Sequence, residues 1–214
     1  MNWRSVTDTI PNMIAKGQAG SLVKAGVRRF YSDRHDYLLR CDLAKPVVVP
    51  RAKIPVTIRP LRDSDIPRIA LELPDRVGVM KSGISTCYLG ITEDDQICYM
   101  QWLIGPSYNH LRPRAIGLTL SHDERLLEWA YTFQRYRGLS IMACGMGQIL
   151  QQGRADGARW VYTIVETNNI PSLKGCRAVG FEPYQKRSEP WRLLWQRQMY
   201  RQLSEREQYP VGTW

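Results

Sequence analysis

The sequence has few cysteines, and none of the five lies in a CxxC pair. Zinc sites and thiol redox motifs usually contain such a pair, so neither a metal site nor a redox site is indicated. The number of cysteines is odd and their spacing is wide, which argues against a disulfide framework. There is no apolar run of about 20 residues, the length that a membrane span requires, and no signal-peptide pattern at the N-terminus. We therefore expect a cytoplasmic protein.

Acidic residues are outnumbered: 20 are Asp or Glu against 30 Lys or Arg, which gives a net charge of +10. A basic surface attracts polyanions such as nucleic acid, an acidic carrier protein or a phosphorylated cofactor. The sequence has no block of five or six consecutive basic residues, so most arginines are expected on solvated faces. Nucleic acid is therefore not a favoured partner, and the segment 186–206 is the sole contender for such binding.

The composition, with 43% hydrophobic and 23% charged residues, is that of a folded protein. A chain of 214 residues can bury one good core. Residues 1–52 are rich in glycine in their first half, with a short predicted strand at 37–43. We interpret 1–52 as an N-terminal extension that packs on the main domain. Residues 53–200 form that main domain, and 201–214 form a C-terminal tail.

The main domain mixes strands and helices in one order along the chain. Alternating and continuous apolar runs predict strands at 56–61, 86–91, 97–104, 115–120, 125–133, 160–165, 181–185 and 191–196. Capping residues and apolar stripes predict helices at 63–73, 138–153 and 170–179. The resulting fold class is α+β, in a three-layer α/β/α arrangement.

One junction has the pattern of a phosphate site. A strand ends near Phe133, a tight turn follows, and a long helix starts at Gly138. Amides at a helix start have no partner inside the helix and lie at the positive end of its dipole, so they bind phosphate well. Gly138 allows close approach, Ser140 adds a hydroxyl, and the side chains of Arg135 and Arg137 add charge. By itself, this pattern also fits an ordinary structural turn.

The sequence resembles the GNAT acyltransferase superfamily at this junction and beyond it. That family has a coenzyme A loop of the form Gln/Arg-x-x-Gly-x-Gly/Ala, and this chain has Arg-Tyr-Arg-Gly-Leu-Ser at 135–140. Ser140 departs from the pattern but is small. Downstream come a strand from Val161, Asn169, a helix and a Gly-Phe pair at 180–181, in the family's order. The resemblance covers roughly residues 54–197.

The resemblance implies a mostly antiparallel sheet with splayed central strands, which bind acyl-coenzyme A between 125–133 and 160–166. Main-chain groups at 130–133, Phe133 included, would pair with the pantetheine arm. Amides at 137–141 would hold the pyrophosphate, and Asn169 would contact the pantetheine or fix its loop. These implied cofactor-binding residues are Phe133, Arg135, Arg137, Gly138, Leu139, Ser140, Ile141 and Asn169.

The implied activity is N-acyl transfer, with acetyl-CoA as the first donor to consider. A primary amine of a small molecule, amino acid or peptide would attack the thioester directly, and a main-chain N–H would stabilise the oxyanion. Two alternatives stay open: a longer acyl chain delivered by an acyl carrier protein, and a GNAT-fold binding module that has lost its chemistry. The sequence leaves a homodimer open as well.

The catalytic residues are less clear than the cofactor loop. In the family, a Tyr seven residues after the Asn often protonates the leaving thiolate, and this chain has Cys176 there. Cys176 is therefore either a substitute acid or a small buried helix residue, and Tyr184 or departure without an acid are the other options. Glu128 lies mid-strand among apolar neighbours, where burial would raise the pKa of its carboxyl, so it is our candidate base. A solvated or ion-paired Glu128 is equally compatible, and Glu124 is a second candidate.

Aromatic and polar residues near the predicted hairpin suggest an acceptor pocket. Trp102 lies in the strand 97–104, and Tyr108 and Asn109 lie in the loop that follows. We predict that these three line the acceptor pocket, although aromatic residues on strands are more often part of the core.

Overall fold

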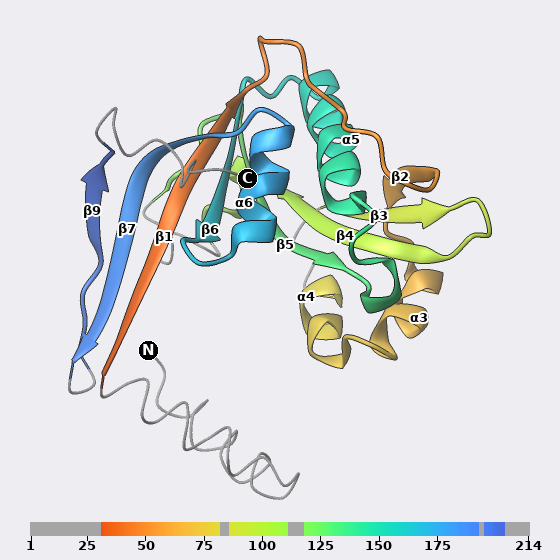
Figure 1. Ribbon diagram of the computed structural model, residues 1–214, viewed down its shortest axis with the longest axis horizontal. Coiled ribbons are helices and arrows are strands. Elements are labelled where there is room, and N and C mark those ends of the chain that lie inside the picture. The colour runs from red at the N-terminus through yellow and green to blue at the C-terminus, as the bar shows by residue number, and fades with distance from the viewer. Residues whose placement is uncertain (1–30, 82–85, 111–117, 193–194, 204–214) are drawn as a thin grey trace, which may run out of the picture.

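The structure is a computed structural model, and it describes residues 31–81, 86–110, 118–192 and 195–203 (Figure 1). Within these residues the strands are β1 (Tyr31–Asp42), β2 (Val56–Pro60), β3 (Cys87–Thr92), β4 (Ile97–Ile104), β5 (Glu124–Thr132), β6 (Trp160–Glu166), β7 (Glu182–Arg192), β8 (Trp195–Gln196) and β9 (Met199–Gln202). The α-helices are α3 (Ile66–Ala70), α4 (Val77–Lys81), α5 (Ile141–Ala155) and α6 (Ile170–Ala178). Short 3-10 turns lie at Asp63–Asp65, Pro74–Arg76, Pro106–Tyr108 and Gln134–Tyr136.

All the strands belong to one twisted sheet in the order β2-β3-β4-β5-β6-β1-β7-β8, with β9 on the outer side of β7. Every pairing is antiparallel except that of β5 with β6. The predicted strand at 115–120 lies largely outside the described residues. The hairpin of β3 and β4 and the helix α6 have the positions that the sequence predicts.

Strand β1 lies inside the sheet, whereas the sequence analysis assigned its residues to an N-terminal extension. Residues 31–42 belong to the segment that we assigned to an extension packing on the domain, but β1 pairs with β6 on one side and β7 on the other. Both its edges are hydrogen-bonded and Leu39 has no exposed surface. The pairing partners lie more than a hundred residues away in the sequence, so local patterns could not reveal them.

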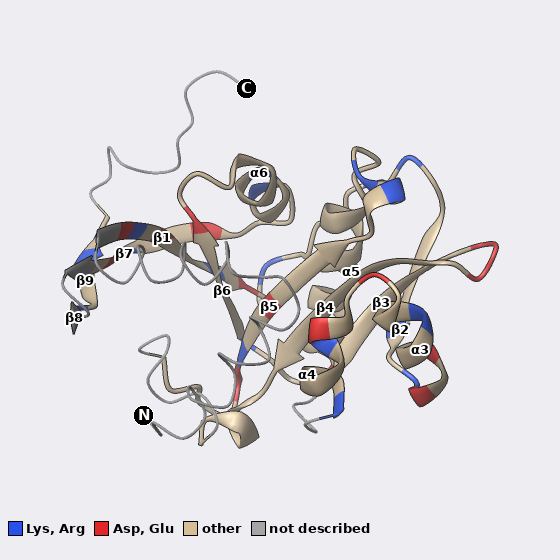
Figure 2. Ribbon diagram, turned by 90° about the horizontal axis from the view of Figure 1, so that it is seen from below, with Lys and Arg blue, Asp and Glu red and all other residues tan. Residues whose placement is uncertain are grey.

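Helices cover both faces of the sheet (Figures 1 and 2). On one face, α5 and α6 pack on a core that includes Leu39, Tyr99 and Val161. On the other face, α3 and α4 pack on Leu89 and Trp102. The three-layer α/β/α prediction is confirmed. None of the described helices is both long and apolar enough to cross a membrane.

Two predicted helices differ from the observed ones. The helix expected at 63–73 is divided into a 3-10 turn, the short α3 and a second turn, because Pro74 excludes helical backbone at Leu73, which has φ −130° and ψ 60°. Helix α5 begins at Ile141 and not at Gly138. Gly138 and Ser140 have φ values of 76° and 59°, so the right-handed helix cannot start before Ile141.

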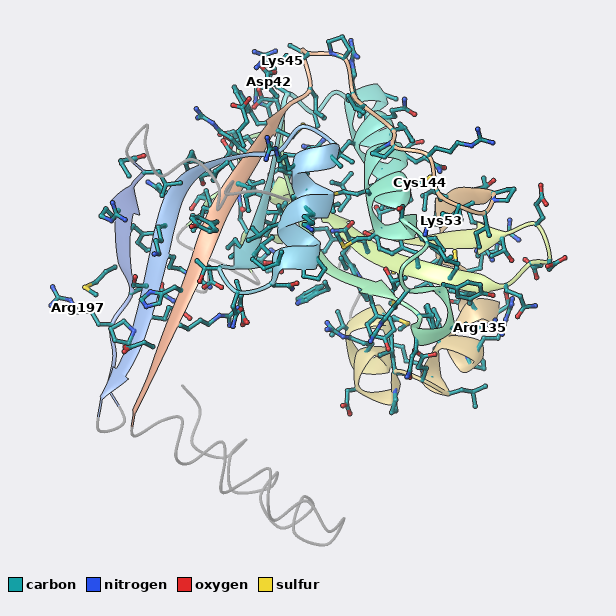
Figure 3. The ribbon with its side chains drawn as sticks, viewed as in Figure 1. Asp42, Lys45, Lys53, Arg135, Cys144 and Arg197 are labelled. Atoms are coloured by element: carbon teal, nitrogen blue, oxygen red, sulfur yellow. The ribbon has the colours of Figure 1, made fainter. Side chains whose placement is uncertain are left out.

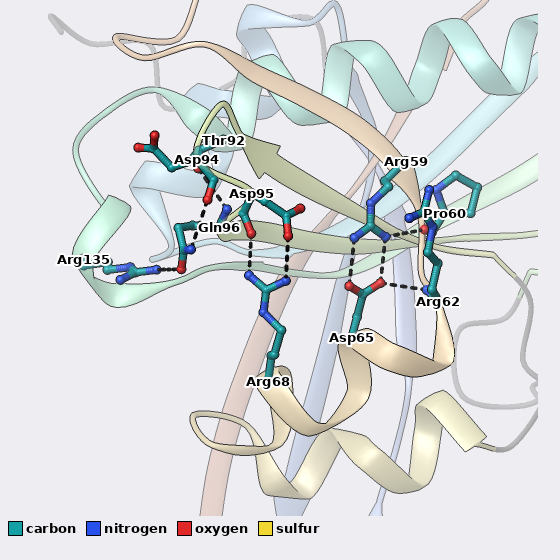
Figure 4. A network of polar contacts seen from close by, with 10 residues as sticks. All are labelled: Arg59, Pro60, Arg62, Asp65, Arg68, Thr92, Asp94, Asp95, Gln96 and Arg135. Carbon is teal, nitrogen blue, oxygen red and sulfur yellow. Dashed lines mark hydrogen bonds and ion pairs between the residues drawn. The ribbon is translucent and has the colours of Figure 1, made fainter.

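An ion pair of 3.4 Å between Arg68 and Asp95 joins α3 to the β3–β4 hairpin, and further polar contacts lie beside it (Figure 4). The Arg59 guanidinium donates two hydrogen bonds to the buried Asp65, at 2.7 and 2.8 Å, and holds the pKa of that carboxyl below its usual value. In the hairpin loop, Gln96 accepts a hydrogen bond of 3.0 Å from Arg135. The Arg135–Gln96 bond ties the loop before α5 to the hairpin.

Candidate functional site

The central strands β5 and β6 separate soon after they meet. Their parallel pairing covers Glu124 with Trp160, Arg125 with Val161 and Leu126 with Tyr162, and it ends there. Beyond these pairs, β5 continues to Thr132 without a partner on that side. The sheet is therefore splayed on the side that leads to α5, as the resemblance implied.

A bulge in β5 lies at the point where the strands part. Trp102 pairs with Glu128, and Met100 pairs with Tyr131, so two residues of β5 lie opposite the single residue Gln101. Trp129 has φ 55°, a left-handed conformation that is costly for a bulky residue. Strained backbone of this kind is concentrated at functional sites, and a bulge re-aims the residues around it.

A cavity of about 470 Å³ opens at the splay. Its wall is formed by β4, β5 and β6, by helices α5 and α6, and by charged residues from β1, β7 and the turn before α4. The lining residues are Arg34, Arg76, Gln101, Glu128, Trp129, Ala130, Met142, Met146, Thr163, Ile164, Val165, Glu166, Asn169, Ser172, Cys176 and Arg187.

Both predicted catalytic residues line this cavity. Glu128 is half-buried on β5, directly before the bulge. Cys176 projects from α6 and has only 2% of its surface exposed. Burial raises the pKa of the Cys176 thiol to about 12. Tyr184, the other candidate acid, stacks edge-on against Tyr162 and is not among the lining residues.

Glu124, the second candidate base, has a structural role. One of its carboxylate oxygens accepts a hydrogen bond of 2.8 Å from the Tyr162 hydroxyl, and the other accepts one of 2.8 Å from the Ser121 amide. Both oxygens are thus engaged in holding the start of β5.

The strand-to-helix corner has exposed residues directly before the first turn of α5. Gly138 is exposed, and a Cβ placed on it would meet no atom within 4 Å. Ser140 is the N-cap residue in a left-handed conformation, without a side-chain capping bond. Amides of the first turn of α5, from Ile141 onward, have no carbonyl partners within the helix. The corner is therefore open and polar.

The neighbouring side chains of the corner are held in place. The Arg137 Nε donates to the Thr132 carbonyl at 3.2 Å, and its guanidinium lies over the Tyr131 ring. Arg135 stacks on Tyr136, with 4.7 Å between Cζ and the ring centroid. Figure 3 shows Arg135 on the loop below the start of α5. Both arginines are exposed, so their charge is accessible at this corner.

Leu139, Phe133 and Asn169 are tied to the protein by main-chain or capping bonds. The Leu139 carbonyl accepts a hydrogen bond of 2.9 Å from the Lys53 amide, which fastens the corner to the segment before β2. The Phe133 amide donates to the Cys98 carbonyl and is therefore not available to a pantetheine arm, and the Phe133 carbonyl accepts one hydrogen bond from the Tyr136 amide. Asn169 caps α6 by accepting from the Ser172 amide at 3.3 Å. Its place in the cavity wall also brings it near a ligand there.

The three residues expected in an acceptor pocket lie elsewhere. Trp102 has no exposed surface and packs edge-on against Trp129, with 5.4 Å between ring centroids, in the core under α3 and α4. Asn109 bonds to both the amide and the carbonyl of Leu120, at 3.0 and 2.9 Å, and so fixes a loop. Tyr108 lines a separate, very small hollow with Asn109. The alternation of a strand does not say which face is core, so the sequence could not separate these roles.

Charged residues that the sequence did not indicate meet at one wall of the cavity. Arg187, with 4% of its surface exposed, donates to the fully buried Asp36 at 2.8 Å and lies 3.3 Å from Glu189. Arg34 bridges Asp36 and Glu166, at 3.1 and 3.3 Å. These residues come from β1, β6 and β7, and they are neighbours only because β1 lies between the other two strands.

Three solved structures with a similar arrangement carry the description of an acetyltransferase. A GCN5-related glucosamine N-acetyltransferase region of a fungal GH3 β-N-acetylglucosaminidase has a TM-score of 0.57 and 12% identity, over 79% of this chain and 22% of that one. A putative GNAT-family acetyltransferase from Novosphingobium aromaticivorans has a TM-score of 0.54 and 16% identity, over 74% and 64% of the two chains. This chain has the GNAT fold. A GCN5-related N-acetyltransferase from Sphaerobacter thermophilus matches it similarly, with a TM-score of 0.54 and 13% identity over 82% and 57%.

The similarity to GNAT structures is evidence for the fold alone. The chain spans between 22% and 64% of the length of these three structures, at identities of 12–16%. No family model and no curated protein matches the sequence.

Proposed function

We propose that the chain is an N-acyltransferase that moves an acyl group, in the first place acetyl, from acyl-CoA to a primary amine. The amine would belong to a small molecule, an amino acid or a peptide. The observation that supports this function most is the splay of β5 and β6, with a cavity of about 470 Å³ between them and an open corner at its end. The GNAT fold of the solved acetyltransferases supports the same class of reaction.

The corner supplies what a diphosphate requires. First-turn amides of α5 would donate to the phosphate oxygens, and the dipole of the helix favours negative charge at this end. The absence of a Cβ at Gly138 leaves room for close approach. Arg135 and Arg137 would add charge-assisted contacts. From there the pantetheine arm would extend into the splay, beside Ala130 and Asn169 in the cavity wall.

The reaction needs a base near the thioester carbon. Glu128 would accept a proton from the amine, because it lines the cavity next to the bulge. The amine nitrogen then forms a bond to the carbonyl carbon, the oxygen carries negative charge, and the carbon–sulfur bond breaks to give the amide and the CoA thiolate. Main-chain donors near the bulge would stabilise the oxyanion.

The leaving thiolate does not need a proton from Cys176. Burial raises the pKa of this thiol to about 12, whereas an ordinary thiol has a pKa of about 8.5. Proton transfer from Cys176 to the CoA thiolate would therefore be uphill. We propose that Cys176 forms part of the cavity wall and that the thiolate leaves without a dedicated acid.

Thermal unfolding with and without acetyl-CoA tests the donor site. A ligand at 100 times its dissociation constant adds about 2.7 kcal/mol to the free energy of unfolding, so the melting temperature should rise by several degrees. Mass spectrometry of the purified protein for bound acyl-CoA, followed by a screen of amines for release of free thiol, tests the reaction. No stabilisation by any CoA thioester would refute the proposal.

Two other results of the same screen would each support one of the alternative functions. Turnover with an acyl carrier protein and none with acetyl-CoA would assign a longer-chain acyltransferase, for which the net charge of +10 is suitable because carrier proteins are acidic. Binding of acetyl-CoA without thiol release by any amine would assign a binding module.

A further inference from the structure

The cavity contains one polar side chain in an otherwise apolar strand. Strand β4 reads Ile-Cys-Tyr-Met-Gln-Trp-Leu-Ile from Ile97 to Ile104, and all its residues are buried. Gln101 has only 2% of its surface exposed, yet it lines the cavity between β5 and β6. A buried amide is costly unless its donors and acceptor are satisfied, so its presence here requires an explanation.

The neighbouring Tyr99 fixes the direction of this amide. Tyr99 has no exposed surface, and its hydroxyl donates a hydrogen bond to Gln101 Oε1. Burial raises the pKa of the Tyr99 phenol well above its ordinary value, so the phenol remains a donor. With Oε1 bonded to Tyr99, the two N–H groups of Gln101 Nε2 are the donors that this amide can offer to the cavity that it lines.

Gln101 and Glu128, the proposed base, line the same cavity. Gln101 lies opposite the bulge of β5, between the pairs formed by Trp102 with Glu128 and Met100 with Tyr131. Tyr99 and Gln101 share the face of β4 that α5 covers, since side chains alternate along a strand and Tyr99 belongs to the core under α5. Met142 and Met146 from α5 line the same cavity. A thioester that enters along the splay would have its carbonyl near this amide.

We propose that Gln101 is a catalytic residue that donates a hydrogen bond from Nε2 to the carbonyl oxygen of the acyl thioester. The inference rests on the proposed function. It adds a side-chain hydrogen-bond donor to the site that would bind acyl-CoA. As the amine attacks, negative charge develops on this oxygen, and the hydrogen bond strengthens because its donor is already oriented by Tyr99. When the carbon–sulfur bond breaks, the carbonyl re-forms and the electron pair leaves on sulfur. Gln101 gives up no proton in either step.

The test compares two CoA ligands, of which only one has a carbonyl group. Wild type, Gln101→Leu and Gln101→Met are titrated by calorimetry with acetyl-CoA and with S-ethyl-CoA, in which a methylene group replaces the carbonyl. Both substitutions keep the approximate size of the side chain and remove the donor. We expect wild type to prefer acetyl-CoA by roughly five- to tenfold, and both variants to bind the two ligands with a ratio near one. Gln151→Met, on the exposed face of α5, is the matched control and should keep the wild-type ratio.

A purely structural role for Gln101 predicts another outcome. In that case both ligands would weaken together in the variants and the ratio would stay at the wild-type value, which would overturn the inference while leaving the proposed function intact. Failure of wild type to bind either ligand would refute the proposed function and the inference with it. If the Gln101 variants fold poorly, Tyr99→Phe gives a second test, because an amide that has lost its anchor should show a reduced ratio.

Discussion

Gly138 and Gly157 are equivalent in backbone geometry but lie at opposite ends of α5. Their φ values are 76° and 80°, and a Cβ on either would meet no atom within 4 Å. We predict that Gly138→Glu and Gly157→Glu each lose about 1–2 kcal/mol of stability from strain. Only Gly138→Glu should abolish the melting shift with acetyl-CoA, since it places a negative charge where the phosphates would bind. A full shift in Gly138→Glu would show that the corner is not the phosphate site.

Cys176 separates two interpretations of the position after Asn169. If the thiol were the general acid, Cys176→Ala would reduce kcat by about 10²-fold or more. Because burial raises the pKa of the thiol to about 12, we expect kcat with the best amine to stay within about threefold of wild type. The pH profile of kcat should then have the same inflections in wild type and in Cys176→Ala. A hundredfold loss would restore the thiol as the acid.

At the scale of elements, β1 depends on a buried ion pair for its place between β6 and β7. Asp36 is fully buried, and the Arg187 side chain is 5% exposed. Removing one partner of a buried pair leaves an uncompensated charge, so Asp36→Ala should lose about 3–5 kcal/mol in urea unfolding. Arg34→Ala removes a side chain that is 49% exposed and should lose less than about 1 kcal/mol. Equal losses in the two variants would contradict a buried pair.

Helix α5 approaches the segment before β2 closely through a glycine. A Cβ on Gly147 would lie 2.8 Å from the Val48 carbonyl oxygen and 2.9 Å from the Val49 Cα, and these main-chain atoms cannot yield cheaply. We predict that Gly147→Ala loses about 1–3 kcal/mol of stability. Gly78→Ala in α4, where nothing lies within 4 Å, should gain about 0.4–1 kcal/mol. Chemical denaturation of both variants measures the difference in the free energy of unfolding. An unchanged stability in Gly147→Ala would mean that the segment before β2 can move away from α5.

At the scale of the whole molecule, buried thiols make stability sensitive to high pH. Burial raises the pKa of Cys41 and Cys98 to about 11, and that of Cys87 and Cys176 to about 12, from 9.0. A raised pKa in the folded state means that the contribution to stability is complete below pH 9 and is lost as the pH rises toward 11–12. We expect the free energy of unfolding to fall above pH 9, by up to about 1.4 kcal/mol per pH unit for each thiol. Urea midpoints that stay constant from pH 9 to 10.5 would contradict this.

The elements of the fold could largely be predicted from the sequence, because they depend on neighbours in the chain. The alternation in β3 and β4, the apolar stripe of α5 and the cap of α6 by Asn169 are local features. The corner could be found as well, although its helix starts three residues later than expected, since left-handed backbone at Gly138 and Ser140 has no clear signal in composition.

The site could be predicted only in part. Glu128, selected for its place mid-strand, lines the cavity with Asn169 and Cys176, which were selected from the family resemblance, but Trp102 and Asn109 serve the core and a loop. A signal for Gln101 was available, because it is the one polar amide in an apolar strand. Its significance depends on the bulge opposite it, which is a property of strand pairing.

The sequence by itself determined the order of strands and helices and the polar corner before α5, because hydrophobic period, capping and glycine act within a few residues. Only the tertiary structure decided that β1 enters the sheet between β6 and β7 and brings Arg34 to the wall of the cavity. Strand pairing joins residues more than a hundred positions apart, and the burial of Asp36 against Arg187 follows from that pairing. No pattern within a single segment carries this information, since any exposed strand edge can accept several partners.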